Sequence, residues 1–411
     1  MHIGLADFAE PTLLLLFEVA SLTDSTTVTD ALGFTRTYQY QALTGAAIGL
    51  GTTGASAPSA DGNDIASQVF DGQSLLASQA DFLGVTTMFT WDATRRLPTA
   101  VTEAAGRAEA RTTQYTWHAT LRLPLTETTG SLVTTYGYDT SGRLLTRQLT
   151  DTAAGTSRTW SQTYTPTGLV ATQTEPNGAV TTYGYDAAGQ LLQLTDPLGH
   201  VTTYTRDAAG RVLTETGPTG EFTSYTYDLR GRLLTVVRGG EQTSFTYTPT
   251  GQLYTAAFPS GHQVTYRYDA AQRLTGWQDN RGADTTFVLD ALGNRTSEQI
   301  RTTAGAVVWQ LARTINGANR VIAETVGANQ TTTFGHDANG QLTSEANALS
   351  QSTHYGLDGL KRLSAITDAA NAVATLAYDA RDAVTTATDF KGVATTYGRN
   401  AFGEPRRRMG A

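Results

Sequence analysis

The sequence predicts an all-β protein: a long antiparallel sheet of hairpin repeats, wound into a spiral that forms an open or partial β-shell. Three observations support this prediction. A Tyr-Asp-x-x-Gly-Arg-Leu motif returns at a nearly constant interval, a second turn divides each interval, and the residues between the turns are typical of strands.

The motif has its fullest form at residues 138–144, Tyr-Asp-Thr-Ser-Gly-Arg-Leu. Its Asp position recurs at Asp186, Asp207 and Asp228, an interval of 21 residues, and about 15 copies follow one another from Asp92 to Asn400. A few intervals of 26 residues indicate insertions in loops. A fixed period of this length is the signature of a repeat architecture, so we expect 81–404 to form one repetitive domain.

Each repeat contains a second turn, as in Asp-Pro-Leu-Gly at 196–199 and Gly-Pro-Thr-Gly at 217–220. Proline presets φ and glycine accepts positive φ, so both segments favour tight turns. The residues between turns are rich in Thr, Tyr, Val and Leu, as at 221–227. One repeat is therefore strand, turn, strand, turn, and a sheet of about 30 strands is expected to curl rather than stay flat.

We predict that the recurring positions of the motif are structural. The Asp carboxylate accepts backbone N–H groups across the turn, Tyr rings pack between copies, and Arg offsets the charge of neighbouring Asp residues. The predicted structural repeat residues are Trp91, Asp92, Tyr138, Asp139, Gly142, Arg143, Tyr185, Asp186, Gly189, Asp207, Gly210, Arg211, Tyr227, Asp228, Gly231, Arg232, Tyr268, Asp269, Asp290, Gly293, Asp337, Gly340, Asp358, Tyr378 and Asp379.

The two ends of the chain depart from the repeat. Residues 1–80 lack a clean register and are expected to be irregular, with degenerate repeats, and 405–411 to form a short basic tail containing three Arg residues. The apolar run at 13–17 is flanked by acidic residues and preceded by no Lys or Arg, so it does not resemble a signal peptide. The run is also too short to span a bilayer.

Composition excludes several classes of function. The 411 residues carry a net charge of −8, which argues against nucleic-acid binding through phosphate contacts. The chain has no Cys, which removes disulfides and thiolate metal sites, and its six His residues show no ligand spacing. We therefore expect no metal and no cofactor.

The sequence favours a protein that is not an enzyme. Residues 49–54 match G-x-G-x-x-G, but Pro58 would interrupt the helix that a dinucleotide site requires, which favours a flexible loop. Nearly all Asp residues occupy turns, where a hydrogen-bonding role suffices, and no catalytic residue is predicted. Carbohydrate contact through Trp160, Trp277 or Trp309 is an alternative function, because sugars stack on aromatic rings.

The repeated motif resembles the YD repeats of Rhs proteins, a family of bacterial polymorphic toxins, over roughly 81–404; the segment from Trp91 to Pro98 also resembles an Rhs core segment. Related shells occur in insecticidal toxin complexes and in teneurins. The resemblance implies a non-enzymatic scaffold, a partial shell that encapsulates or helps to deliver a toxin. A carbohydrate-binding or cell-surface adhesion module is the alternative.

The resemblance also implies partners and a location. The main partner would be a C-terminal toxin cargo or effector that this chain does not contain, with secretion-spike proteins, as in type VI secretion, or glycans as further partners. The protein would be located outside a bacterial cell or on its surface, and it would be exported without a signal peptide. The Asp-Pro-x-Gly-Leu self-cleavage motif that usually ends such shells is missing after Asn400, so we expect a partial, open shell.

Overall fold

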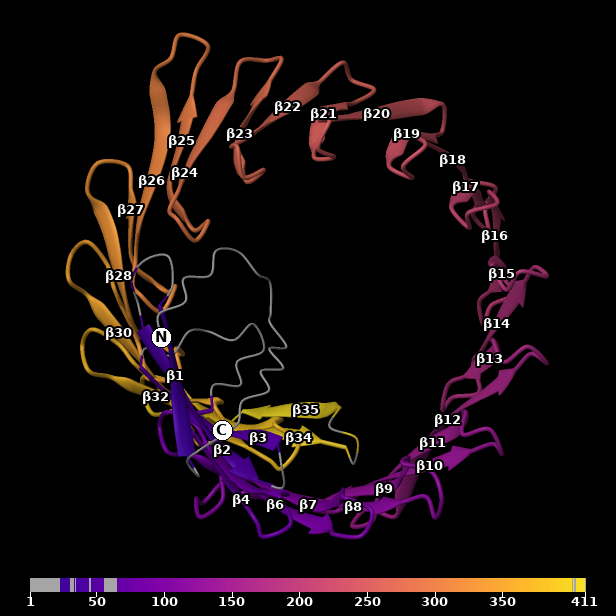
Figure 1. Ribbon diagram of the computed structural model, residues 1–411, viewed down its shortest axis with the longest axis vertical. Helices are drawn as coiled ribbons and strands as arrows, with labels where there is room; N and C mark the ends of the chain where they lie inside the picture. The colour runs from indigo at the N-terminus through magenta and orange to yellow at the C-terminus, as the bar shows by residue number, and fades with distance from the viewer. Residues whose placement is uncertain are drawn as a thin grey trace.

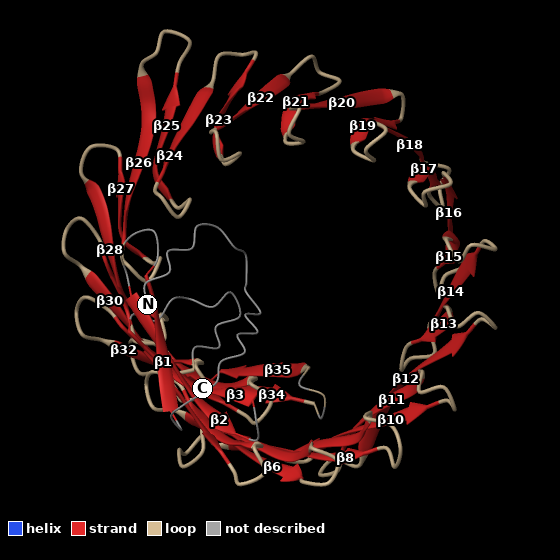
Figure 2. Ribbon diagram, in the orientation of Figure 1, coloured by secondary structure: helices blue, strands red, loops and turns tan. Residues whose placement is uncertain are grey.

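The computed structural model describes residues 23–29, 33, 35–43, 46–54, 65–400, 402 and 404–410. Every regular element in these ranges is a β-strand, joined to the next by a short turn or loop (Figure 2). The predicted all-β class is confirmed. The apolar run at 13–17 lies outside the described residues.

The strands are short, mostly five to nine residues. In chain order they are β1 (Thr23–Thr29), β2 (Thr35–Leu43), β3 (Ala46–Gly54), β4 (Ser67–Phe70), β5 (Leu76–Ala80), β6 (Thr86–Asp92), β7 (Leu97–Glu103), β8 (Arg111–Trp117), β9 (Pro124–Thr129), β10 (Leu132–Tyr138), β11 (Leu144–Asp151), β12 (Thr156–Tyr164), β13 (Val170–Thr174), β14 (Val180–Tyr185), β15 (Leu191–Thr195), β16 (Val201–Arg206), β17 (Val212–Thr216) and β18 (Phe222–Tyr227). They continue as β19 (Leu233–Arg238), β20 (Glu241–Tyr247), β21 (Leu253–Ala257), β22 (Gln263–Tyr268), β23 (Leu274–Asp279), β24 (Asp284–Leu289), β25 (Arg295–Arg301), β26 (Val307–Ile315), β27 (Val321–Val326), β28 (Gln330–His336), β29 (Leu342–Ala346), β30 (Ser352–Leu357), β31 (Leu363–Thr367), β32 (Val373–Tyr378), β33 (Val384–Thr388), β34 (Ala394–Arg399) and β35 (Pro405–Gly410).

One long sheet runs from β4 to β35 in chain order, and each strand pairs antiparallel with the next. The sheet bends into a ring whose last strands return to its first ones (Figure 1). Its ends overlap as in a spiral, and the sheet is not closed into a barrel. A separate three-stranded sheet is formed by β1, β2 and β3. The predicted spiral, open shell is confirmed.

The wall has two different faces because side chains alternate along each strand. The register places Tyr225, Tyr227, Tyr247, Tyr266 and Tyr268 on one side, which we call the tyrosine face. The opposite side, the threonine face, carries cross-strand Thr pairs. Their hydroxyls lie 2.6 Å apart in the pairs Thr205–Thr214, Thr226–Thr235 and Thr246–Thr255.

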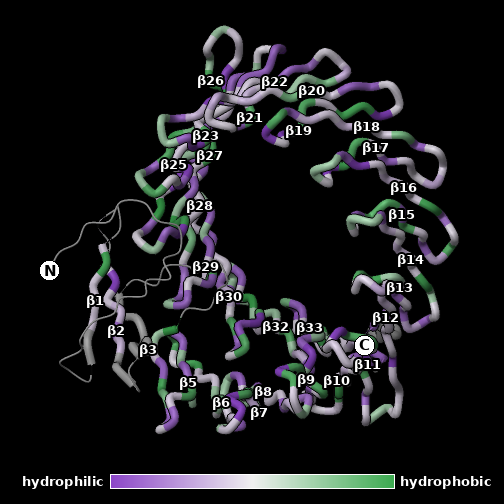
Figure 3. The backbone as a smooth tube through the Cα atoms, turned by 45° about the vertical axis from the view of Figure 1, so that its right-hand side comes forward, coloured by the Kyte–Doolittle hydropathy of each residue, from purple (hydrophilic) through white to green (hydrophobic). Residues whose placement is uncertain are grey.

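The wall is a single layer. The accessible surface is 24753 Å², whereas a compact protein of this mass would expose about 15,000 Å². Apolar and polar residues alternate throughout the ring instead of segregating into a core (Figure 3). The buried apolar side chains are few and scattered, and they include Ala256, Phe287 and Leu311. Both faces of the wall are therefore largely accessible, as expected for a shell.

The sheet extends beyond the predicted repeat region at both ends. It begins at β4, within the segment 1–80 that we expected to be irregular, because 67–80 already form a hairpin that pairs with β6. At the other end, β35 pairs with β34 over 405–410, within the segment predicted to form a short basic tail. Neither segment carries a complete motif, which shows that backbone pairing can continue the sheet without the motif.

The glycine motif at 49–54 is not a loop. It lies in β3, which pairs with β2 from Leu43↔Ala46 to Arg36↔Gly54. A sheet ladder uses backbone groups only, so the missing side chains do not prevent pairing. The neighbouring residues 55–64 lie outside the described ranges.

Candidate functional site: the repeat turns and the seam of the wound sheet

Each motif forms a tight turn that the Asp side chain closes. Asp139 Oδ1 accepts hydrogen bonds from the backbone N–H groups of Ser141 and Arg143, both at 2.9 Å. The N–H of Gly142 donates to the Asp139 carbonyl at 3.0 Å, and Gly142 has φ of +81°. Glycine adopts this left-handed conformation without a steric penalty, which explains its place in the motif.

The motif Arg joins its own turn to the next repeat. Arg143 Nε donates to Asp139 Oδ2 at 2.6 Å, and the guanidinium carbon lies 4.7 Å from the ring centroid of Tyr164. Arg232 repeats the arrangement, with its pair to Asp228 at 2.6 Å. A cation above an aromatic face is attracted by the ring quadrupole. The Arg residues therefore link the repeats laterally, in addition to the backbone ladder.

The motif Tyr provides a second lateral link in the opposite direction. The Tyr185 hydroxyl donates to the Val170 carbonyl at 2.9 Å, one hairpin earlier. Where Trp replaces Tyr, the indole does the same: Trp91 Nε1 donates to the Leu76 carbonyl at 2.7 Å. Trp therefore supplies both a hydrogen-bond donor and an aromatic ring at this position, as Tyr does.

The turn network also lowers carboxylate pKa values. The backbone hydrogen bond from Arg143, reinforced by its guanidinium, lowers the pKa of Asp139. Equivalent hydrogen bonds from the motif Arg of each turn lower the pKa of Asp207, Asp228 and Asp269. At Asp207, the hydrogen bond from the Arg211 guanidinium is a larger cause than the one from the Arg211 backbone. These carboxylates are stabilised in their charged form, as ion-pair partners rather than proton-transfer groups.

The structure places every predicted repeat residue at a motif turn or at the strand end beside it. Trp91, Tyr138, Tyr185, Tyr227, Tyr268 and Tyr378 lie at or next to the ends of their strands. The turn residues are Asp92, Asp139, Gly142, Arg143, Asp186, Gly189, Asp207, Gly210, Arg211, Asp228, Gly231, Arg232, Asp269, Asp290, Gly293, Asp337, Gly340, Asp358 and Asp379. They form a row along one rim of the wall, which we call the motif rim; the second turns form the opposite rim.

The structure reveals a contact that the sequence did not predict. The motif turns of β28–β35 meet the second turns of β5–β12, where the end of the spiral overlaps its beginning. We call this contact the seam. At one end of the seam, Asn339 Oδ1 accepts the backbone N–H of Phe82 at 2.9 Å, and Asn339 Nδ2 donates to Asp81 Oδ2 at 2.8 Å.

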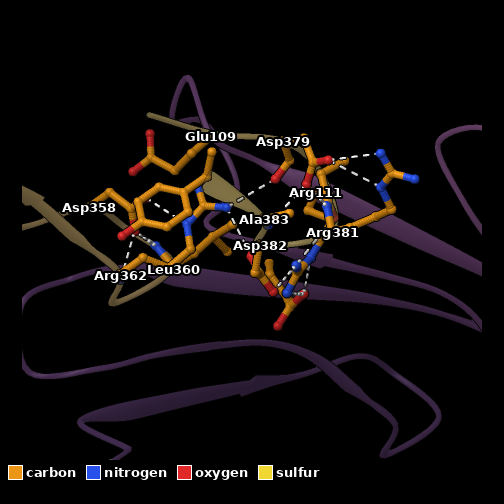
Figure 4. A network of polar contacts seen from close by, with 12 residues as sticks. Glu109, Arg111, Asp358, Leu360, Arg362, Asp379, Arg381, Asp382 and Ala383 are labelled. Atoms are coloured by element: carbon orange, nitrogen blue, oxygen red, sulfur yellow. Dashed lines mark hydrogen bonds and ion pairs between the residues drawn. The ribbon is translucent and has the colours of Figure 1, made fainter. Parts of the chain in front are cut away.

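The middle of the seam is a chain of alternating charges (Figure 4). Arg111 pairs with Glu103 at 2.8 Å within its own hairpin and with Asp382 at 2.7 Å across the seam. The other carboxylate oxygen of Asp382 accepts a hydrogen bond from Arg362 at 2.8 Å. Arg362 pairs in turn with Asp358 at 2.8 Å. Beside this chain, the Glu109 carboxylate accepts the backbone N–H of Gly359.

The far end of the seam is a bidentate pair. The two terminal nitrogens of Arg158 donate to the two carboxylate oxygens of Glu404 at 2.7 and 2.8 Å. The Arg158 guanidinium also lies over the Phe402 ring, 4.2 Å from its centroid. Hydrogen bonds from Arg158 and Asn400 lower the pKa of Glu404 to about 2.

The seam accounts for several of the few buried residues of the protein. Ala104, Asp151 and Asn339, which are 2%, 7% and 8% exposed, all lie on its two sides. A small cavity of about 180 Å³ opens beside Ala104 and is also lined by Asp81, Glu103 and Lys361. No group of three or more His, Asp or Glu side chains in the described part of the chain is arranged to hold a metal ion.

Two residues at the glycine position of the motif lie at the seam. Lys361 and Asp382 occupy this position with φ of +63° and +62°, and both approach the opposite rim. Gln272 and Asn319 also replace Gly in left-handed turns but lie within the wall, so the substitution alone does not identify the seam.

The tryptophans proposed for carbohydrate contact, Trp160, Trp277 and Trp309, are all half-buried, and the Arg147 guanidinium covers Trp160 at 4.8 Å. No helix in the described ranges is long and apolar enough to cross a membrane.

Comparison with known proteins supports the repeat assignment. The family model described as Teneurin YD-shell matches residues 134–298, and that described as RHS Repeat matches 336–373 and 358–394. These ranges cover the central and C-terminal parts of the wound sheet. No curated protein matches the chain.

Solved structures show the same wound sheet. A crystal structure of TcdB2-TccC3-Cdc42 aligns with TM-score 0.63 and 17% identity, covering 94% of this chain and 23% of that chain. A Photorhabdus luminescens Tc holotoxin pore gives the same four values. A crystal structure of TcdB2-TccC3 aligns with TM-score 0.57 and 16% identity, covering 92% of this chain and 25% of that chain.

This chain spans about a quarter of the length of those structures. At this identity the likeness establishes the fold alone. The repeat matches and the fold together confirm the resemblance first inferred from the motif: the chain contains repeats of the Teneurin YD-shell type over 134–298 and of the RHS type over 336–394, and it has the fold of a wound β-shell.

Proposed function

We propose that this chain is a non-enzymatic scaffold, a partial shell that encloses or helps to deliver a toxin effector. The single-layer wall carries this proposal, because few of its described side chains are buried and both faces therefore offer surface for contact with another polypeptide. The similarity to the TcdB2-TccC3 structures supports it at the level of the fold.

The position of the last strands also supports containment. In the view of Figure 1, β34 and β35 lie inside the outline of the ring. A polypeptide that continues from β35 would therefore start on the enclosed side of the wall. This favours a cargo joined after β35 over a ligand bound to the outer surface, as an adhesion module would bind it.

Protease protection tests containment directly. A short unfolded peptide with a protease site is fused after Ala411, and in a second variant the same peptide is inserted between Ala187 and Ala188, at an exposed motif turn. We expect slow cleavage of the first and fast cleavage of the second. Equal cleavage rates in two equally folded variants would contradict containment.

Two further aspects are part of the proposal. The chain would perform no catalysis, and purified protein would remain one intact band after prolonged incubation. It would act outside the bacterial cell, which fractionation of the producing cells can test. Carbohydrate binding remains the alternative function, and strong signals on a glycan array together with a negative protection test would favour it.

A further inference from the structure

The seam and the rest of the wall are held together by different kinds of bond. From β4 to β35, every neighbouring pair of strands shares a backbone ladder, as between β10 and β11 or β24 and β25. Across the seam, no backbone-to-backbone hydrogen bond joins the two windings within the described ranges. The hydrogen bonds and ion pairs that cross it use at least one side chain.

The side chains that cross the seam are partly open to solvent. Asp382 and Glu404 are 47% and 53% exposed, and their partners Arg111 and Arg158 are 20% and 32% exposed. Ion pairs of this kind contribute about 0–1 kcal/mol each, and salt screens them. The apolar contribution at the seam is small, since Ala104 is the only fully covered apolar side chain among the described seam residues. The seam is therefore the weakest line in the ring.

We propose that the seam is a salt-sensitive closure, which opens reversibly while the wound sheet stays intact. Asp382 is its central group, because its two oxygens join Arg111 of the first winding to Arg362 of the last. Separating the windings breaks side-chain contacts only and leaves the backbone ladders unchanged. The inference concerns the ring itself and does not depend on an enclosed effector.

The charges around Asp382 make the closure specific. Arg111 faces it from β8, with Glu103 of β7 behind, and Arg362 faces it from the turn before β31, with Asp358 behind. The charges alternate along this chain, so each Arg is shared by two carboxylates. In the same turn, Arg381 is paired with Asp379 at 2.9 Å. Salt weakens every ion pair in this row of alternating charges at once, which favours a concerted opening of the seam.

A distance measurement across the seam tests the proposal. The chain has no Cys, so Ala110→Cys with Ala380→Cys allows two spin labels to be attached at exposed positions on the two sides. Pulsed electron paramagnetic resonance then measures their separation near neutral pH. Salt is raised from about 0.1 M to about 1 M, which shortens the Debye length from about 10 Å to about 3 Å. The control pair is Ala188→Cys with Ala209→Cys, at two neighbouring motif turns joined by backbone ladders.

We expect the short distance across the seam to lose population at high salt and the control distance to stay constant. Asp382→Asn is expected to raise the ratio of open to closed molecules about five-fold at low salt, the equivalent of one exposed ion pair. Arg111→Gln should act in the same direction. Arg313→Gln is the matched control, because Arg313 forms a cross-strand pair with Glu324 at 3.0 Å away from the seam. An unchanged seam distance under all these conditions would refute the proposal, as would an equal change in the control pair.

A covalent bridge gives an independent test. A Cβ atom built on Gly359 would lie 3.3 Å from the Cβ atom of Ala104, so Ala104→Cys with Gly359→Cys can form a disulfide once the Glu109 carboxylate and the Arg107 side chain, whose Cδ would lie at 2.7 Å, move aside. We expect the radius of gyration, measured by small-angle X-ray scattering, to rise with salt in the unmodified chain and to stay constant in the oxidised variant. Reduction should restore the response. A salt response that persists in the fully bridged protein would place the opening elsewhere and overturn the inference.

Discussion

The guanidinium of Arg232 lies over the ring of Tyr247 in the next repeat, 4.5 Å from its centroid, while it also pairs with Asp228 in its own turn. The contact illustrates how stability is distributed in this protein. With no thick core, each repeat depends on its neighbours, and stability is approximately a sum of repeat and nearest-neighbour terms.

Removing this link should loosen the wall locally. We expect Arg232→Ala to destabilise the hairpins around β18–β21 by about 1 kcal/mol through loss of the cation–π contact. Hydrogen exchange of these strands measures the effect. Arg238→Ala is the control, because Arg238 is 71% exposed and lies 3.6 Å from Glu221. Equal exchange in the two variants would show that the stacked Arg contributes nothing.

The left-handed turns can be tested without a steric complication. Gly178 has φ of +82°, and an added Cβ atom would contact nothing within 4 Å. We expect Gly178→Ala to cost about 1–2 kcal/mol from backbone strain alone. Gly72→Ala is the matched control, since Gly72 is equally open but not left-handed. Thermal unfolding should separate the two variants, and equal midpoints would contradict the explanation.

A buried hydroxyl offers a stabilising substitution. Thr285 is 0% exposed, and its Oγ1 has no hydrogen-bond partner in the part of the chain that the structure describes. Thr285→Val keeps the shape and removes the unsatisfied group, so we expect a gain of about 1 kcal/mol. Thr286→Val, on the opposite face of β24, should give no such gain. Denaturant unfolding measures both, and a loss of stability at 285 would show that the hydroxyl is satisfied.

Acid should weaken the motif rim and the far end of the seam. The folded-state pKa values of Asp139, Asp207, Asp228 and Asp269 are lowered, and that of Glu404 falls from 4.5 to about 2. A group with a lowered folded-state pKa stabilises the fold above its unfolded-state pKa, and this contribution is lost as the pH falls through the folded-state value.

We therefore expect stability to decrease from about pH 4.5 to about pH 2. Circular dichroism of the strands and the seam distance can be followed together over this range. In Glu404→Gln, the distance between labels at the far end of the seam should respond less to acid, with the remaining response due to Asp382, whose pKa is also lowered, while the motif rim should respond as before. A seam that opens in acid to the same extent in this variant would assign the effect to other groups.

The repeat and its local geometry were predictable because they depend on nearby residues. Asp139 caps a turn formed by the next four residues, and Gly142 supplies its left-handed conformation, so a single motif specifies both. The strands at 67–80 and 405–410 lie where no complete motif marks them, because backbone pairing continues the sheet without the motif.

The seam could not be predicted in the same way. Arg111 and Asp382 are 271 residues apart, and their meeting depends on the accumulated curvature of all the hairpins between them. A small change in twist at each hairpin would move the contact by a whole strand. Local sequence specifies the turn that holds Asp382 in place but not the residue that lies opposite.

The overlap of the two windings sets the perimeter of the ring. Its contacts join residues separated by 246 to 280 positions, which corresponds to about twelve to thirteen 21-residue units. Insertion or deletion of one unit in the intervening wall would leave every hairpin intact yet shift Asp382 away from Arg111 and Glu404 away from Arg158. Natural selection for a ring of fixed perimeter would thus act on the few charged side chains at the overlap. The repeats in between could diverge in sequence as long as their number stayed the same.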